Sequence, residues 1–431
     1  MSKKRRSVKK EEVIEPFITA GMKQHLKYLV GLSILVKLII VFVSVGVLGA
    51  GMDMFAINYY YEHAITIFQG NYPYINYYYE YPILIFIPVC IALIPSLLFH
   101  SIFVFMITFS LLMIICDCIT TICVYLIARK IWNDPKKAFI SALIYLTALC
   151  AMYFVMVSYD AFPSCLLMIG LTMLVYGKEM SGFFGLNEYF TISLGYFSKV
   201  YPIVSLPFII LYKSRSTSLK QEIISALKII IPISVVLFVP MFILNPGSVF
   251  KTYFPSRMDI GYFPNTIIWT VYVWLHDIFK INVLIENVLT ISYICMVIGF
   301  LVLFYMAFKY QKQNPVVLFK FILCAIMLIV LSFKVRSPGY IVWFTPFLCI
   351  LIADNIYKIG LFVIYQILAY IEFPLTFWAL WTNTEYTNPI YSTNWYLALV
   401  LFTLEFSILL LLLWFAVEPI KLYKDIFIKV D

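Results

Sequence analysis

Long apolar runs constrain this sequence more than any other feature. A helix needs roughly 17 to 25 apolar residues to cross a bilayer about 30 Å thick, and backbone inside the bilayer must satisfy its hydrogen bonds internally. Candidate runs cover residues 28–50, 101–127, 139–155, 161–175, 223–244, 285–308, 317–333, 340–352, 359–375 and 395–416. We therefore predict an all-α polytopic transmembrane bundle of about 10–13 membrane helices, some broken or re-entrant.

The composition agrees with a membrane protein. Of the 431 residues, 63% are hydrophobic and 12% are charged, whereas soluble domains have about 25% charged residues. The net charge of +9 could indicate nucleic-acid binding, but the basic residues sit mostly between apolar runs, where orientation in the membrane explains them. We expect no nucleic-acid partner.

Cysteine and histidine give no sign of a metal or disulfide site. The nine cysteines lie almost all inside apolar runs, with no pair placed to link an extramembrane loop. The four histidines lack the spacing of metal ligands. No protein-held metal and no other cofactor are therefore expected.

Two apolar segments are interrupted. Residues 82–100 contain three prolines, at positions 82, 88 and 95. Residues 189–212 carry Lys199 and Pro202 near their centre, which predicts two half-helices that enter and leave by one face of the membrane. Such a break is tolerated only where it is buried in protein.

The distribution of basic residues predicts the orientation. The start MSKKRRSVKK places the N-terminus in the cytoplasm, and the following run is about twice as long as a signal-peptide core, which favours an anchor over a cleaved signal. If residues 82–100 crossed the membrane, the basic segment 128–137 would lie outside. We therefore expect 82–100 to lie in the interface or to re-enter.

This topology gives a multi-pass cell-membrane protein with a single transmembrane domain. Residues 1–27 form a basic cytoplasmic N-terminus, 28–416 the membrane domain and 417–431 a cytoplasmic tail. The extracytoplasmic face then receives the segments 51–100, 157–160, 245–286, 334–340 and 382–395. Most of the unusual polar residues collect on that face, so we expect an active site there.

Asp53 follows the first apolar run and precedes MFAINYYYEHAITIFQG. That stretch alternates apolar and polar residues with a roughly helical period, which predicts a helix lying along the membrane surface. Asp53 could cap this helix or act as a general base. Both interpretations remain open on this pattern alone.

Lys334 and Arg336 lie on the predicted outer side, although lysine and arginine are usually enriched in cytoplasmic loops. Such a pair suits a phosphate or carboxylate ligand, but it could also pair with Glu80 or Asp160 or reach lipid headgroups. Both possibilities stay open.

Ionisable residues at membrane depth need a polar cavity or an ion partner. Lys199 is the strongest case. Asp117 is expected to pair with a lysine such as Lys37 or Lys199 and to be structural. Asp160 could cap the next helix or have a function.

Aromatic residues make up 18% of the chain and are dense in YPYINYYYEYP. They could form an interfacial belt, fill the core or provide a platform on which sugar rings stack. Glu62 and His63 lie in the same region and could be ordinary interface residues.

The order of these motifs resembles a known family. Asp53 is followed by YYYEHA, GNYPY, YEYP, SYDAFP, KVYP and KVRSPGYIVWFTP. This series resembles the membrane glycosyltransferases of the GT-C superfamily, most closely the polyprenyl-phosphate-sugar-dependent mannosyltransferases of glycosyltransferase family 87. The likeness covers about residues 25 to 415, and each motif is short.

The resemblance implies roles for individual residues. Asp53 would be the catalytic base. Lys334 and Lys199 match family positions and would bind the donor phosphate together with Arg336, the second cation of the late turn. The matching residues Tyr74, Tyr81, Asp160, Tyr201, Tyr340 and Trp343 would bind substrate, and Glu62, His63 and Glu80 beside them are further substrate-binding candidates. The chain departs from the family pattern at Ile83, where members often have a second proline, and at Gly339, where many have glutamine.

The resemblance also implies a reaction. The enzyme would move a hexose, mannose in the nearest members, from a polyprenyl or dolichyl phosphate to a lipid or glycan acceptor, with inversion and without a metal. Membrane lipids would be its other partners. The alternative is a transporter or flippase of lipid-linked sugars, which should place functional charges along a path through the bilayer.

Overall fold

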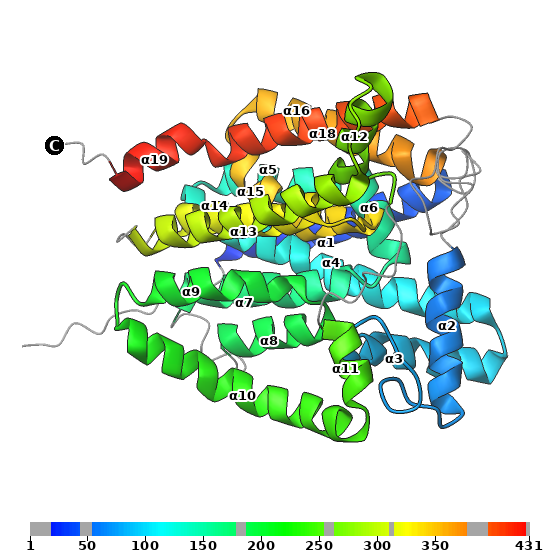
Figure 1. Ribbon diagram of the computed structural model, residues 1–431. Coiled ribbons are helices and arrows are strands. Elements are labelled where there is room, and N and C mark those ends of the chain that lie inside the picture. Colours follow the sequence, from blue (N-terminus) through cyan, green and yellow to red (C-terminus); the bar gives the residue numbers. More distant parts are fainter. Residues whose placement is uncertain are drawn as a thin grey trace, which may run out of the picture.

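The computed structural model describes residues 19–43, 54–177, 187–253, 263–309, 314–376 and 395–427. Every regular element in these ranges is helical (Figure 1). Within these ranges seven helices are long and apolar enough to cross a membrane, or eight if one bent pair is counted as a span, and five shorter apolar helices accompany them. The predicted all-α polytopic bundle is confirmed.

The helices of membrane length are α1 Ala20–Val41, α4 Ile102–Trp132, α10 Leu219–Leu244, α13 Ile285–Lys309, α14 Pro315–Ser332, α16 Ile356–Tyr370 with its continuation η8 Ile371–Leu375, and α18 Trp395–Val417. The shorter elements are α2 Met54–Phe68, η2 Ile83–Ile85, α3 Phe86–Phe99, α5 Pro135–Leu146, α6 Leu149–Val157, α7 Ala161–Tyr176, α8 Glu188–Ser198, η4 Tyr201–Ser205, α9 Leu206–Lys213, α11 Pro246–Tyr253, α12 Ile267–Val273, η6 Trp274–Ile278, η7 Pro338–Tyr340, α15 Ile341–Ile352 and α19 Pro419–Phe427.

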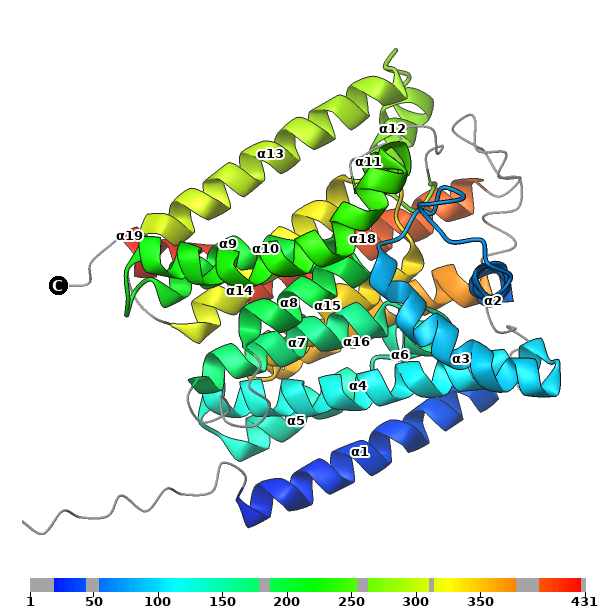
Figure 2. The ribbon, with the colours of Figure 1, turned by 90° about the horizontal axis from the view of Figure 1, so that it is seen from below.

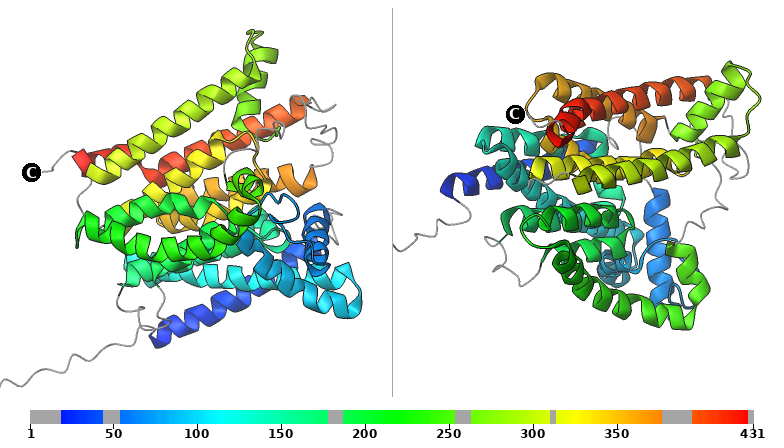
Figure 3. Two further views of the ribbon diagram at one scale, coloured as in Figure 1. Left: turned by 60° about the horizontal axis from the view of Figure 1, so that its bottom comes forward. Right: turned by 60° about the vertical axis from the view of Figure 1, so that its left-hand side comes forward.

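The bundle has two ends, marked by different helices. One end carries α2 and α12, and we name it the α2 end; the opposite end carries α19 and is named the α19 end (Figures 1 and 2). The central helices α7, α14 and α15 are largely buried. In α10 and α13, by contrast, only 6% of the most apolar stretch of the helix is buried. These two helices lie at the periphery (Figure 3), where their apolar side chains would face lipid.

The helix α2 begins one residue after Asp53 and confirms the helix predicted from the alternating pattern. Asp53 itself lies outside the described residues. The following segment 82–100 does not cross the bundle: α3 has 14 residues, about 21 Å of helix, and lies beside α4 near the α2 end (Figure 2). At His100 the chain adopts a φ of 47° and turns into α4.

The predicted span 139–155 is wrong as a single helix. The structure divides it into α5 and α6, which are bent by 60°. At the break Thr147 leaves the helical region and Ala148 is extended, with its N–H donating to the Tyr145 carbonyl, so α5 ends there. The sequence offers neither proline nor glycine at this point, so the break had no obvious signal.

The interrupted segment around Lys199 forms the expected hairpin. The arm α8 ends at Ser198, Lys199 is extended, and the chain returns through η4 and α9. Glu188, the first residue of α8, forms an ion pair with Lys213, the last residue of α9. The two arms therefore begin and end at the same level, as two half-helices should.

A buried ion pair joins the first helices. Lys37 on α1 lies 2.6 Å from the Asp117 carboxylate on α4, and both side chains are at most 1% exposed. Lys37 also donates to the Ser33 hydroxyl at 2.6 Å, and Tyr145 on α5 donates to Asp117 at 2.5 Å. The prediction that Asp117 pairs with a lysine is confirmed, with Lys37 as the partner.

Replacing Lys37 with Met should lower the free energy of unfolding by about 3–5 kcal/mol, because the Asp117 carboxylate stays buried without its cation. The double variant K37M/D117L removes both charges and should lose less than K37M. Chemical unfolding in detergent compares the two variants. A double variant that is as unstable as the single one would contradict this account.

Candidate functional site

Several sequence motifs that are far apart in the chain meet at one place in the bundle. The turn between α6 and α7, the tip of the α8–α9 hairpin, the turn before α15 and the segment before η2 each contribute side chains. We name this cluster the Asp160 site; its residues are Tyr81, Ser158, Tyr159, Asp160, Lys199, Tyr201, Gly339, Tyr340 and Trp343.

Asp160 is the centre of this site and is 2% exposed. Its carboxylate forms an ion pair with Lys199 and accepts the indole N–H of Trp343 at 2.7 Å. The Ser158 hydroxyl donates to its other oxygen at 2.5 Å. Although Asp160 precedes α7, its side chain makes no cap hydrogen bond with that helix. Of the two possibilities left open by the sequence, the structure therefore rejects the cap.

Lys199 is held by aromatic rings as well as by Asp160. Its ammonium lies over the rings of Tyr159, Trp343, Tyr340 and Tyr81, at 4.4, 5.0, 5.1 and 5.7 Å from their centroids. Aromatic faces attract cations, most strongly where water is excluded. This enclosure and the carboxylate explain how a lysine is tolerated in the middle of an apolar segment.

Three of the aromatic residues form a stack. The rings of Tyr201 and Trp343 are 4.3 Å apart with an interplanar angle of 6°, and Tyr340 lies 3.9 Å from Trp343 on centroids. The stack brings flat apolar faces next to a paired positive and negative charge. Such a combination can bind a ligand that has both an anionic group and an apolar face.

Gly339 is buried against Asp160. A Cβ atom at this position would lie 3.0 Å from the Asp160 carboxylate and 3.5 Å from both Phe154 and the Ser158 hydroxyl. The missing side chain therefore leaves room for the carboxylate to sit where it bonds Lys199 and Trp343.

Arg336 does not join the Asp160 site. Its guanidinium lies 2.5 Å from Glu405 and 3.9 Å from Glu372, and it donates to the Asn265 carbonyl at 3.0 Å. Burial opposes its charge, but Glu405 and Glu372 outweigh that effect and keep the pKa of Arg336 above its ordinary value. The structure assigns this cation to a buried network rather than to an open anion site. Lys334 is buried in the same turn.

His63 and Tyr74 lie in a neighbouring aromatic cluster. The Tyr77 hydroxyl lies 3.2 Å from the His63 Nδ1 atom. The Tyr79 ring contacts the rings of His63 and Tyr74, and also that of Tyr81 in the Asp160 site. Burial lowers the pKa of His63, partly offset by Glu62 and Glu80. Burial also raises the pKa of Tyr77 to about 12.

Sequence reasoning singled out Asp160, Lys199, Tyr81, Tyr201, Tyr340 and Trp343, and the structure brings all of them together. It passed over Tyr159, although this residue stands beside Asp160 in the same turn. It also passed over Glu372 and Glu405, the partners of Arg336. Their signal was available, since a carboxylate inside an apolar run needs a partner.

Among the described residues, no group of three or more His, Cys, Asp or Glu side chains could hold a metal ion. The absence of a metal and of a cofactor from the reaction stays a prediction.

Comparisons with known proteins give little further information. No protein-family model and no curated protein sequence matches the chain. Among solved structures it is similar to the crystal structure of ArnT from Cupriavidus metallidurans in the apo state, with 16% identity and a TM-score of 0.47 over 93% of this chain and 76% of that chain. This likeness is too distant to assign a function.

Replacing Gly339 with Ala should destabilise the protein by about 1–3 kcal/mol, because the new methyl group displaces the Asp160 carboxylate. The matched control is Gly360→Ala on α16, where a Cβ meets nothing within 4 Å and helix propensity favours Ala by about 1 kcal/mol. Unfolding in detergent measures both variants. A G339A protein as stable as G360A would contradict the close approach.

The lowered pKa of His63 predicts that the folded protein loses stability in acid. Its folded pKa is lowered, so below the unfolded value of about 6.5 the unfolded chain binds the proton more readily. The contribution of neutral His63 to the free energy of unfolding is present above pH 6.5 and is lost as the pH falls through the folded pKa. The melting temperature of the wild type should therefore fall more steeply below pH 6.5 than that of His63→Gln. Parallel pH profiles would rule out this role.

Proposed function

We propose that the protein is an integral-membrane glycosyltransferase of the GT-C type. It would transfer a hexose, with mannose as the first candidate, from a polyprenyl or dolichyl phosphate to a hydroxyl of a lipid or glycan acceptor. The observation that carries this proposal is the Asp160 site, where a lysine, a carboxylate and an aromatic stack are assembled from distant segments.

The parts of this site correspond to the parts of the donor. A polyprenyl phosphate sugar has an apolar tail, one phosphate and a sugar ring. The ammonium of Lys199 suits the phosphate, and the flat faces of Tyr201, Trp343 and Tyr340 suit the apolar face of a sugar. The surrounding apolar helices suit the tail. No other described cluster combines these three properties.

Lys199 would act on the leaving group. As the bond between the sugar and the phosphate breaks, negative charge grows on the phosphate, and a cation already in place stabilises it. An ammonium has three N–H donors, so it can hold Asp160 and a phosphate oxygen at once. Asp160 would keep both Lys199 and Trp343 in position for this contact.

Asp53 remains our candidate for the general base that takes the proton of the acceptor hydroxyl. A direct attack on the anomeric carbon from the side opposite the phosphate would invert its configuration, so a β-linked donor would give an α-linked product. Arg336 is not proposed to bind the donor, because it forms ion pairs with Glu405 and Glu372. Lys334 stays a candidate for that role.

The reaction would take place on the extracytoplasmic face. The basic segment 128–137 joins α4 and α5 at the α19 end, whereas α2 lies at the opposite end (Figure 2). The positive-inside rule then favours an α19 end in the cytoplasm and an α2 end outside.

A flippase of lipid-linked sugars is the competing function. It would need charges accessible along a path through the bilayer. The Lys37–Asp117 pair does not support such a path, because both side chains are sealed and bonded to Ser33 and Tyr145.

The test is transfer of labelled mannose from a polyprenyl phosphate by the purified protein in the presence of membrane acceptors. Lys199→Met should lower kcat about 10²–10³-fold, because it removes one charge-stabilising group. Asp53→Asn should abolish transfer while donor binding is retained. The control is Lys358→Met, which removes an equally buried lysine that is ion-paired on α16.

Two results would overturn the proposal. Transfer that is unchanged in both Lys199→Met and Asp53→Asn would remove the assigned chemistry. A wild-type protein that forms no product but moves the labelled donor between leaflets of a vesicle would identify a flippase.

A further inference from the structure

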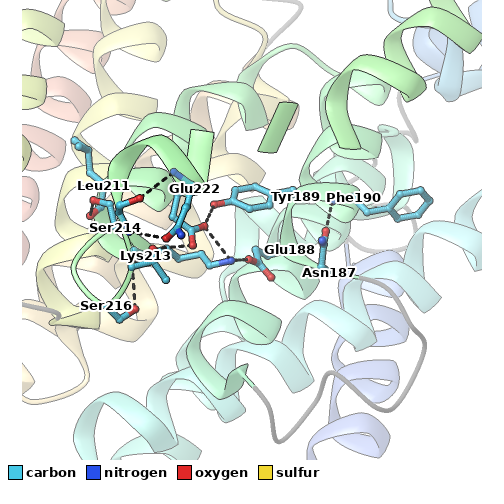
Figure 4. Close-up of polar contacts among 12 residues, drawn as sticks. Asn187, Glu188, Tyr189, Phe190, Leu211, Lys213, Ser214, Ser216 and Glu222 are labelled. Atoms are coloured by element: carbon cyan, nitrogen blue, oxygen red, sulfur yellow. Dashed lines mark hydrogen bonds and ion pairs between the residues drawn. The ribbon is translucent and has the colours of Figure 1, made fainter. Parts of the chain in front are cut away.

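The hairpin that presents Lys199 is tied together at its base. Figure 4 shows this cluster, in which Lys213 at the end of α9 points toward Glu188 at the start of α8. Lys213 also lies 3.3 Å from Glu222 on α10, and Tyr189 donates to Glu222 at 2.8 Å. We name these four residues, Glu188, Tyr189, Lys213 and Glu222, the hairpin clamp.

The clamp joins three helices through one cation. The Lys213 ammonium also lies 4.7 Å from the centroid of the Tyr189 ring, so the carboxylates and an aromatic face contact it, while 30% of its side chain stays exposed. Glu222 is 6% exposed and accepts a further hydrogen bond from Thr217 at 2.9 Å. Two carboxylates therefore face a single ammonium. Without that ammonium the two carboxylates, whose side chains are 11% and 7% exposed, would repel each other.

At the base α8 packs on α7 and α9 packs on α14, and the clamp adds an ionic link from each arm to the other and to α10. Near the tip, the arms approach closely, since a Cβ on Gly195 would lie 3.3 Å from Pro202. The Lys199 N–H donates to the Gly195 carbonyl at 2.8 Å, which joins the tip to α8. The position of Lys199 therefore follows the direction of α8, and the clamp holds the far end of that helix.

We propose that the hairpin clamp positions Lys199 for the reaction, with Lys213 as a positioning residue at the opposite end of the hairpin. The reaction itself rests on the proposed function. The clamp sets the tilt of α8 and α9, and the tilt sets where the Lys199 ammonium lies relative to Asp160 and the aromatic stack.

Helix α8 is long enough for a small tilt at its base to move Lys199. The 11 residues of α8 span about 16 Å, and a tilt of about 4° at the base moves the tip by about 1 Å. A misplacement of about 1 Å in a reacting complex can lower the rate about 10²-fold. A small opening of the clamp is therefore sufficient to affect Lys199 without unfolding the bundle.

The test uses the charge pair of the clamp. Lys213→Glu places three carboxylates together, whereas the swap E188K/K213E restores one ammonium facing two carboxylates. We expect Lys213→Glu to lower kcat at least 10-fold with a smaller change in KM, and the swap to recover most of kcat. Lys358→Met is the matched control, because its ion pairs with Asp354 and Glu418 lie outside the hairpin.

A second measurement does not depend on activity. Lys199 is only 8% exposed, so an amine-acylating reagent followed by mass spectrometry should modify it slowly in the wild type. Lys213→Glu should increase its labelling several-fold. The swap should return labelling to the wild-type level, and Lys358→Met should leave it unchanged. If Lys213→Glu does not fold, Glu188→Gln, which weakens only one contact of the clamp, takes its place.

The outcomes separate the two proposals. Unchanged Lys199 labelling in a folded clamp variant would overturn the clamp proposal, whatever the activity. Labelling that rises equally in Lys358→Met would reduce the effect to general destabilisation and would also overturn it. A wild-type protein without transferase activity would refute the proposed function, while a labelling response specific to the clamp would still support its control of Lys199.

Discussion

The pairing of buried charges is the constraint on which this structure depends. An isolated charge inside an apolar bundle is expensive, whereas a charge with a partner and additional hydrogen bonds is tolerated. Each pair joins segments that are far apart in the sequence: Lys37 with Asp117, Lys199 with Asp160, and Arg336 with Glu405. Removing one partner leaves the other buried alone, so these pairs specify which helices meet.

Two of these pairs have different surroundings, and the difference suggests different roles. In the first pair Lys37 donates to the Ser33 hydroxyl and Tyr145 donates to Asp117, so the pair joins α1, α4 and α5. Around Lys199 the neighbours are flat aromatic rings contributed by the turn before α7 and by the first turn of α15. Binding residues are disproportionately placed on loops that a rigid scaffold positions. The second environment is the one that suits a ligand.

Much of the fold could be predicted from the sequence because bilayer thickness and backbone hydrogen bonding leave few alternatives to helices. The interrupted hairpin was predictable too, since Lys199 and Pro202 mark a break inside an apolar run. The bend at Thr147 was not, because neither proline nor glycine stands there to mark a break. The pairing of Arg336 was not predictable, since Glu372 and Glu405 reach it only through the packing of distant helices.

The sequence by itself determined the class of this protein, the approximate helices and most of the side chains of the Asp160 site, because these depend on local composition and on motifs. Only the tertiary structure decided which charge meets which. Lysine can pair with any carboxylate, and the partner depends on how the helices pack. The structure alone therefore separated Lys199, which meets aromatic rings, from Arg336, which is enclosed by carboxylates.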